Sequence, residues 1–149
     1  MSEADERAAV VAEALTWAGT PYRHRARLKG VGADCAQFPL AVYEAMGLIP
    51  PTDVGAYVQD WHHHRSEELY LGWVRRLARE IDETLAGPGD FAVWRFGRAF
   101  SHGAILIDPP VIIHATVLGR RVHLADYRRD DGLPGRPVKF FSLWGDHGR

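Results

Sequence analysis

The sequence predicts an α+β domain in which helices of the N-terminal half pack on an antiparallel sheet formed by the C-terminal half. Apolar residues recur at helical spacing through much of the first 85 residues, and after residue 88 the period changes to two. Short turns separate the alternating segments of the second half. Helices followed by a run of strands are typical of this fold class, and we expect one domain spanning residues 1–149.

The composition argues against several functional classes. The chain has 149 residues, of which 46% are hydrophobic, enough to bury a core of ordinary size. The net charge of -1 argues against a nucleic-acid partner, which normally requires a basic excess. The apolar runs are far shorter than the roughly 18–20 residues that span a bilayer, so we expect no membrane insertion. The acidic segment Met1–Arg7 is unlike an export signal, which predicts synthesis in the cytoplasm without a signal peptide.

The first predicted helix covers Ala4–Ala18, where small and apolar residues recur at helical spacing. Gly19-Thr20-Pro21 ends it, and a basic loop follows over Arg23–Gly32. A second helix is predicted from Cys35 to Met46, with Gly47 at the position that favours a left-handed residue.

The start of the second helix is marked by a capping pattern. Asp34 precedes the first turn, and Gln37 three residues later completes a capping box. Pro39 lies one turn in and removes an early backbone hydrogen bond, so we expect a kink or a tight first turn. The segment from Pro50 to Arg65 is predicted to be irregular.

A third helix is predicted to begin at Ser66-Glu67-Glu68, a cap followed by acidic residues that suit the helix dipole. Its apolar face runs from Leu69 to Leu85, before Gly87-Pro88. Five short strands follow in a meander with turns such as Asp108-Pro109-Pro110. The predicted strands lie around Phe91 to Trp94, at His102–Ile107, at Val111–Val117, at Val122–Leu124 and at Val138–Phe141.

Cys35 is the single cysteine, which excludes an internal disulfide. On the first turn of a helix, unpaired N–H groups and the positive end of the dipole favour a thiolate, the form that acts as a nucleophile. The alternative is that Cys35 is a small buried hydrophobic residue. Nucleophilic catalysis also needs a base within hydrogen-bond reach, and the chain has eight histidines.

Two of these histidines are predicted to lie together. If Asp108-Pro109-Pro110 closes a three-residue hairpin, Ile107 faces Val111 and Ala104 faces His114. His102 is then the diagonal neighbour of His114 on the same face, about 7–8 Å away at the backbone. One imidazole can then face the thiol while the second orients it, unless a β-bulge turns one side chain to the other face. Taken singly, each is better explained as an ordinary histidine of the sheet than as a catalyst, and the shared face brings the two interpretations level.

Five sequence blocks, in order, resemble the NlpC-type cell-wall cysteine peptidases, which are papain-like. They are Gly19-Thr20-Pro21-Tyr22, Gly30-Val31-Gly32-Ala33-Asp34-Cys35, Gly89-Asp90-Phe91, Ser101-His102-Gly103-Ala104-Ile105 and Ile113-His114-Ala115. Tyr57, Asp60-Trp61-His62 and Phe140-Phe141 look most like the phage-type branch found in tail modules and gene transfer agents. The resemblance implies a papain-like core, with the nucleophile on the N-terminal helical half and the base on the sheet.

The resemblance also implies roles for individual residues. Cys35 corresponds to the nucleophile, His102 to the general base and then acid, and His114 to the residue that orients His102. Tyr22 matches a tyrosine beside the thiol that helps to stabilise the oxyanion. Asp34 and Ser101 match positions that often contact substrate. The implied reaction is hydrolysis of an amide in the peptidoglycan stem peptide, next to D-glutamate or diaminopimelate, through a thioester acyl-enzyme.

The chain departs from the family pattern at two places. Ala36-Gln37 follows the cysteine where a small pair such as Ser-Gly is common, and the loop Arg23–Lys29 is basic where the family is glycine-rich. These cations offer a contact for the carboxylates of an acidic stem peptide, although a solvated loop explains them equally well. The departures concern substrate specificity more than mechanism.

Three functions remain as alternatives on these grounds. The first is a peptidoglycan peptidase or amidase carried by phage-type tail proteins and acting at the cell wall. The second is a non-catalytic tail-assembly or wall-binding module with the same fold, and a lipid acyltransferase ranks last. No cofactor is expected. No metal is expected either, because nothing in the sequence supplies a defined zinc ligand set beside His62-His63-His64.

Overall fold

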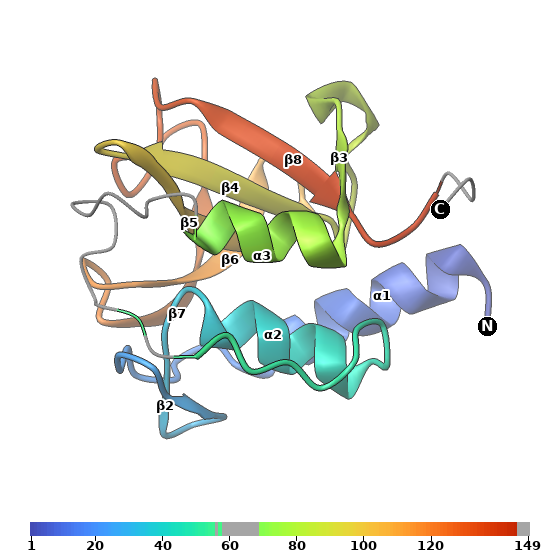
Figure 1. Ribbon diagram of the computed structural model, residues 1–149, viewed down its shortest axis with the longest axis horizontal. Coiled ribbons are helices and arrows are strands. Elements are labelled where there is room, and N and C mark those ends of the chain that lie inside the picture. Colours follow the sequence, from blue (N-terminus) through green and yellow to red (C-terminus); the bar gives the residue numbers. More distant parts are fainter. Residues whose placement is uncertain (56, 58–68, 146–149) are drawn as a thin grey trace.

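The structure, a computed structural model, describes residues 1–55, 57 and 69–145 (Figure 1). Its helices are α1 (Glu3–Leu15), α2 (Gln37–Ala45) and α3 (Leu69–Leu77). A two-stranded hairpin, β1 (Arg27–Leu28) and β2 (Gly32–Ala33), precedes α2. A larger sheet contains β3 (Arg79–Ile81), β4 (Phe91–Phe96), β5 (Ala99–Asp108), β6 (Val111–Thr116), β7 (Arg121–Asp126) and β8 (Val138–Ser142). The predicted α+β class is confirmed.

The six strands of the larger sheet lie in the order β3-β8-β4-β5-β6-β7, and all neighbours pair antiparallel. Figure 1 shows α3 lying across the sheet and α1 beside α2 below it. Alternating residues of β4 enter two clusters, because Phe91 and Val93 pack with the helices while Ala92 and Trp94 pack with Tyr127. Both faces of the sheet are therefore buried, and the helical face carries the segment that contains Cys35.

The third helix is shorter than predicted. α3 ends at Leu77, Ile81 lies in β3, and Leu85 closes a 3-10 turn (Glu83–Leu85) with an exposed side chain. The apolar spacing continues past Leu77, but β3 instead pairs with β8, where Ile81 faces Phe140. Pairing with β8 at the sheet edge satisfies backbone hydrogen bonds of residues 79–81. The helical spacing of apolar residues alone does not reveal this pairing. The cap predicted at residues 66–68 lies outside the described residues.

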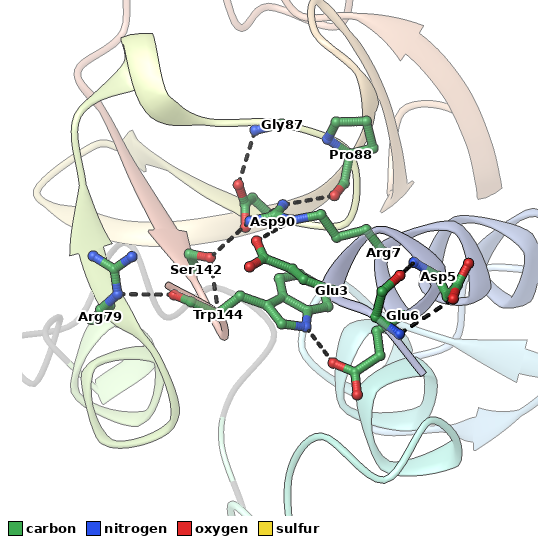
Figure 2. Close-up of polar contacts among 11 residues, drawn as sticks. Glu3, Asp5, Glu6, Arg7, Arg79, Gly87, Pro88, Asp90, Ser142 and Trp144 are labelled. Atoms are coloured by element: carbon green, nitrogen blue, oxygen red, sulfur yellow. Dashed lines mark hydrogen bonds and ion pairs between the residues drawn. The ribbon is translucent and has the colours of Figure 1, made fainter. Parts of the chain in front are cut away.

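A buried ion pair joins α1 to the start of β4 (Figure 2). Nη1 of Arg7 lies 3.0 Å from Oδ1 of Asp90, and the Asp90 side chain is fully buried. The same nitrogen donates to the carbonyl of Pro88, and the Arg7 guanidinium lies over the ring of Trp144, 4.4 Å from its centroid. The second Asp90 oxygen accepts from the backbone N–H of Gly87. These contacts fix the N-terminal helix against the sheet.

Candidate active site

Asp34 holds the turn that carries Cys35. Its Oδ1 accepts hydrogen bonds from the backbone N–H groups of the two residues that follow Cys35, at 3.0 and 2.8 Å. The Asp34 side chain therefore binds the N–H groups of this turn as expected, but α2 begins at Gln37 with Ala36 as its N-cap, two residues later than the predicted start at Cys35. The reciprocal half of the capping box is wrong, because the Gln37 amide contacts Arg27 and the Tyr57 hydroxyl instead. Tertiary partners thus replace a purely local contact.

A tyrosine from α3 fixes the backbone of Cys35. In a regular helix the N–H of residue 39 would donate to the carbonyl of Cys35, but residue 39 is a proline, which has no N–H. The Tyr70 hydroxyl donates to that carbonyl at 2.7 Å. A tight turn at residues 35–36 precedes α2, whereas the sequence predicted a kink or a tight turn within the helix. The Cys35 carbonyl, which cannot accept a hydrogen bond from residue 39, therefore attaches the Cys35 turn to α3.

Gly103 allows this contact, because a Cβ there would overlap the Tyr70 hydroxyl and the Phe91 ring. We expect Gly103→Ala to lower the free energy of unfolding by about 1–3 kcal/mol, since inserted groups strain a packed core. The matched control is Gly72→Ala in α3, where a Cβ meets no atom within 4 Å. There we expect a gain of about 0.5–1 kcal/mol from helix propensity. Urea denaturation of both variants checks the prediction, and equal changes would contradict it.

The Asp34 carboxylate is occupied within the protein. Besides the two capping bonds, Oδ2 accepts from the backbone N–H of Arg25 at 2.7 Å and from the Tyr57 hydroxyl at 2.6 Å. The residue is 1% exposed. Its side chain holds together the loop before Cys35 and the segment that contains Tyr57. Its contact with substrate stays a prediction.

The predicted alignment of β5 with β6 is confirmed, with Ile105 opposite Ile113. The turn differs from the expectation, because Asp108 rather than Ile107 pairs with Val111 and the register shifts there. The two differences cancel: the turn is one residue shorter than predicted, and the shift at Ile107 restores the predicted register, so His102 and His114 keep the expected common face. A second register shift lies between β4 and β5, beside Ser101.

The contact between His102 and His114 is confirmed. Nε2 of His102 lies 2.8 Å from Nδ1 of His114. The chain of contacts continues to Asp131, whose Oδ2 lies 2.7 Å from Nε2 of His114 and 2.9 Å from Nε2 of His123. His114 is fully buried. We call His102, His114, His123 and Asp131 the histidine relay.

The sequence prediction missed two members of the relay. One is His123, which lies directly opposite His114 in the β6–β7 hairpin. The loop between β6 and β7 spans residues 117–120, with Thr116 opposite Arg121, whereas a turn at Leu118-Gly119-Arg120 would place His123 opposite Ala115. The turn expected from the sequence therefore does not find this pair. Asp131 lies in the loop between β7 and β8, and only its fold-dependent position brings it to the histidines.

The hydrogen-bond partners set the proton positions in the relay. A carboxylate can only accept, so both Nε2 atoms that meet Asp131 must carry protons. A neutral His114 then has an unprotonated Nδ1, which accepts from Nε2–H of His102. Nδ1 of a neutral His102 is consequently left without a proton. Asp131 thus prepares His102 to accept a proton at Nδ1.

A pocket of about 180 Å³ brings Cys35 and His102 together. The thiol of Cys35, 7% exposed, donates to the carbonyl of Ser101 at 3.7 Å. Asp131 and the exposed Leu118 also line the pocket. Its described lining comprises Tyr22, Cys35, Phe96, Ser101, His102, Ala115, Thr116, Val117, Leu118 and Asp131. The predicted Tyr22 and Ser101 therefore share a pocket with the predicted nucleophile and base, while their roles stay predictions.

Solved structures of low sequence identity share this fold, although no model of a known protein family and no curated protein matches the sequence. The NlpC/p60 domain of the peptidoglycan hydrolase SagA has a TM-score of 0.62 and 23% identity, over 89% of this chain and 96% of its own. NlpC2 from Trichomonas vaginalis has a TM-score of 0.69 and 16% identity over 98% of this chain, which spans 49% of NlpC2. RipD from Mycobacterium tuberculosis, a non-catalytic NlpC/p60 domain protein adapted to peptidoglycan binding, has a TM-score of 0.60 and 15% identity, over 93% of this chain and 98% of its own.

The chain has the NlpC/p60 fold. The predicted papain-like NlpC-type core is thereby confirmed as a fold. The similar structures include both a domain of a hydrolase and a non-catalytic wall-binding protein, so the fold alone does not decide activity. The chemistry must be argued from the residues of the pocket.

Burial determines the charge of Cys35 in this NlpC/p60 fold. Loss of water raises the pKa of the Cys35 thiol far above its ordinary value, and the neighbouring Asp34 carboxylate raises it further. The expected lowering by the helix N-terminus is therefore wrong for this state. Burial, followed by the nearby His114, lowers the pKa of His102 well below its ordinary value. The resting pair is a neutral thiol and a neutral imidazole, not an ion pair.

The relay predicts a loss of stability in acid. Burial, and then the nearby His123, lowers the pKa of His114 from 6.5 to about 3. Between these values the unfolded chain binds a proton that the folded chain does not, so stability falls as the pH drops below 6.5. From His114 alone we expect a loss of about 2 kcal/mol between pH 7 and pH 5. Urea denaturation at the two pH values measures it.

The assignment to His114 is tested with two variants. In His114→Gln, the difference in unfolding free energy between pH 7 and pH 5 should shrink by about that amount. Gly72→Ala, which changes no titratable group, should leave the difference as it is in the parent protein. An unchanged difference in His114→Gln would contradict the assignment.

Part of the positive charge of the basic loop Arg23–Lys29 is neutralised by carboxylates of the same chain. Lys29 forms an ion pair with Glu13 at 2.8 Å, and Arg27 pairs with Glu44. Arg25 and Arg27 line a separate polar pocket of about 480 Å³. Contact between these cations and an acidic peptide stays a prediction. Because Arg27 and Lys29 already pair with carboxylates, Arg25 is the main candidate for that contact. None of the helices in the described ranges is long and apolar enough to cross a membrane.

Proposed function

We propose that this chain is a cysteine peptidase or amidase that hydrolyses an amide bond of the peptidoglycan stem peptide. The observation that carries the proposal is the histidine relay, which leaves Nδ1 of His102 unprotonated in a pocket shared with Cys35. A wall-binding module would need no such proton order. The structural similarity to the domain of the peptidoglycan hydrolase SagA supports peptidoglycan as the substrate class.

The proposed reaction begins with a neutral pair. As Sγ of Cys35 attacks the amide carbonyl, its proton passes to Nδ1 of His102, which avoids a stable thiolate in a buried site. The tetrahedral oxyanion is stabilised by nearby donors, for which Tyr22 is the candidate from the resemblance. His102 then protonates the leaving amine, and a thioester with Cys35 remains. Water, deprotonated by His102, hydrolyses the thioester and restores the thiol.

Tail association is a further part of the proposal. It is supported by the sequence resemblance to the phage-type branch, at Tyr57, Asp60-Trp61-His62 and Phe140-Phe141. In this proposal the enzyme is made in the cytoplasm, assembled into a particle and delivered to the cell wall. Co-purification of the chain with particles from its source tests this part, and its absence from intact particles would overturn it.

Digestion of purified peptidoglycan tests the enzymatic proposal. The native protein should release peptides with new termini, detected by mass spectrometry, whereas Cys35→Ala should release none above background. Binding to intact sacculi is measured in parallel, since Cys35→Ala should still bind. Native protein that binds sacculi without cleaving them would overturn the enzymatic proposal and favour a wall-binding module, the function described for RipD.

A further inference from the structure

We propose that His114, His123 and Asp131 form a binding site for a divalent zinc-type metal ion, and that the bound ion switches off His102 as a base. The three residues offer two imidazole nitrogens and one carboxylate oxygen, and these donor atoms all lie within 4.8 Å of one another. Such a set suits zinc, which takes nitrogen and oxygen ligands in a tetrahedral arrangement. The binding half of the proposal is independent of the proposed enzymatic function, whereas the switch rests on it.

The geometry of the sheet presents the two imidazoles together. His114 and His123 pair directly across β6 and β7, and their rings stack with centroids 5.2 Å apart and an interplanar angle of 27°. Nε2 of each ring points to the same oxygen, Oδ2 of Asp131, at 2.7 and 2.9 Å. Ligands around tetrahedral zinc are about 3.4 Å apart. The donor atoms, all within 4.8 Å of one another, therefore need only small shifts to form three sides of a coordination shell.

Two of the three residues are partly exposed to solvent, and His102 forms a hydrogen bond with the third. The side chains of His123 and Asp131 are 20% and 21% exposed, and Asp131 also lines the pocket that contains Cys35. Nδ1 of His114 already contacts His102, an outer hydrogen bond of the kind that orients a metal-binding imidazole. Among the described residues, the cluster is thus accessible to an ion from solvent, and His102 holds one of its imidazoles in place.

Metal binding would reverse the proton order of the relay. An ion takes the lone pair of Nε2 of His114, so the proton of that ring must lie on Nδ1. Nδ1–H then donates to Nε2 of His102, and the proton of His102 must move to Nδ1. Each ring keeps one proton, so no net proton is gained or lost by this pair. His102 can then no longer accept the thiol proton at Nδ1.

Binding is tested with Zn²⁺ by calorimetry and with Co²⁺ by visible absorption. The protein used carries alanine at His62, His63 and His64, whose imidazoles would otherwise compete for the ion. We expect one ion per chain, affinity at least tenfold weaker in His123→Gln and in Asp131→Asn, and affinity unchanged in Cys35→Ala. Equal affinity in His123→Gln would overturn the site. A cobalt–thiolate band that disappears in Cys35→Ala would also overturn it, because the ion would then bind the thiol.

The switch is tested by nitrogen-15 spectra of labelled histidine, which distinguish the two tautomers without any measure of activity. Saturating Zn²⁺ should convert His102 from Nε2–H to Nδ1–H, and an unchanged His102 tautomer would overturn the switch. In the peptidoglycan assay Zn²⁺ should inhibit hydrolysis and a chelator should restore it. The inhibitory concentration should rise at least tenfold in His123→Gln, measured against the metal-free rate of that variant. Metal binding with the expected tautomers but no hydrolysis without metal would refute the enzymatic function alone.

Discussion

Replacing Asp131 with alanine is expected to lower kcat for peptidoglycan hydrolysis on the order of 100-fold, with little change in KM. Asp131 contacts His114 and His123 rather than His102, so it acts as a positioning residue. Without its carboxylate, Nε2 of His114 has lost its acceptor, and the tautomer that leaves Nδ1 of His102 free is no longer favoured. Steady-state kinetics on a soluble stem peptide measure the effect.

Asp131→Asn is the matched variant for this prediction. Asp131 has a positive φ of 58°, a conformation that asparagine tolerates better than alanine does. Asparagine also keeps one acceptor oxygen, so it should recover at least tenfold of the kcat lost in the alanine variant. A fall in kcat that simply follows the loss of unfolding free energy in both variants would show a structural role only. An unchanged kcat in Asp131→Ala would refute the relay.

Replacing Arg7 with alanine is expected to lower the free energy of unfolding by about 3–5 kcal/mol. The variant leaves the fully buried Asp90 carboxylate without the guanidinium that lies 3.0 Å from its Oδ1. It also removes the guanidinium from the face of the Trp144 ring (Figure 2). A buried charge without a partner is costly because it has lost its hydration. Urea denaturation at neutral pH measures the change.

The control is Arg75→Ala, which removes another arginine from an ion pair with a carboxylate. Arg75 and Glu80 lie 3.6 Å apart, and their side chains are 53% and 45% exposed. An exposed pair of this kind contributes about 0–1 kcal/mol. Similar losses in the two variants would show that burial of Asp90 is not what makes the Arg7 pair important.

Local sequence predicted the elements where periodicity and caps agree. The first two helices and the five predicted strands lie near their predicted ranges, because caps, turns and apolar periods are local properties. The predicted meander is wrong for the last strand, because β8 pairs with β4 and β3 rather than with β7. The third helix was overextended, since the spacing from Leu77 to Leu85 suits a helix equally well. Pairing of β3 with β8, some 60 residues away in sequence, decided that region.

The sequence predicted the nearness of His102 and His114, because the side chains of a strand alternate and the predicted register places the two on one face. The structure reaches that register differently: the turn is one residue shorter than predicted, and the register shift at Ile107 restores the alignment. The placement of Cys35 beside the Asp34 cap was equally local. The chemistry predicted for the pair could therefore be stated before any fold was known.

Only the tertiary structure decided how that pair is charged and oriented. Asp131 meets His114 from a separate loop, and Tyr70 of α3 binds the carbonyl of Cys35. Burial raises the pKa of the Cys35 thiol where its position at a helix start predicted a lowering. The physical reason is that desolvation and long-range hydrogen bonds depend on which segments pack together, whereas caps and register depend on neighbours along the chain.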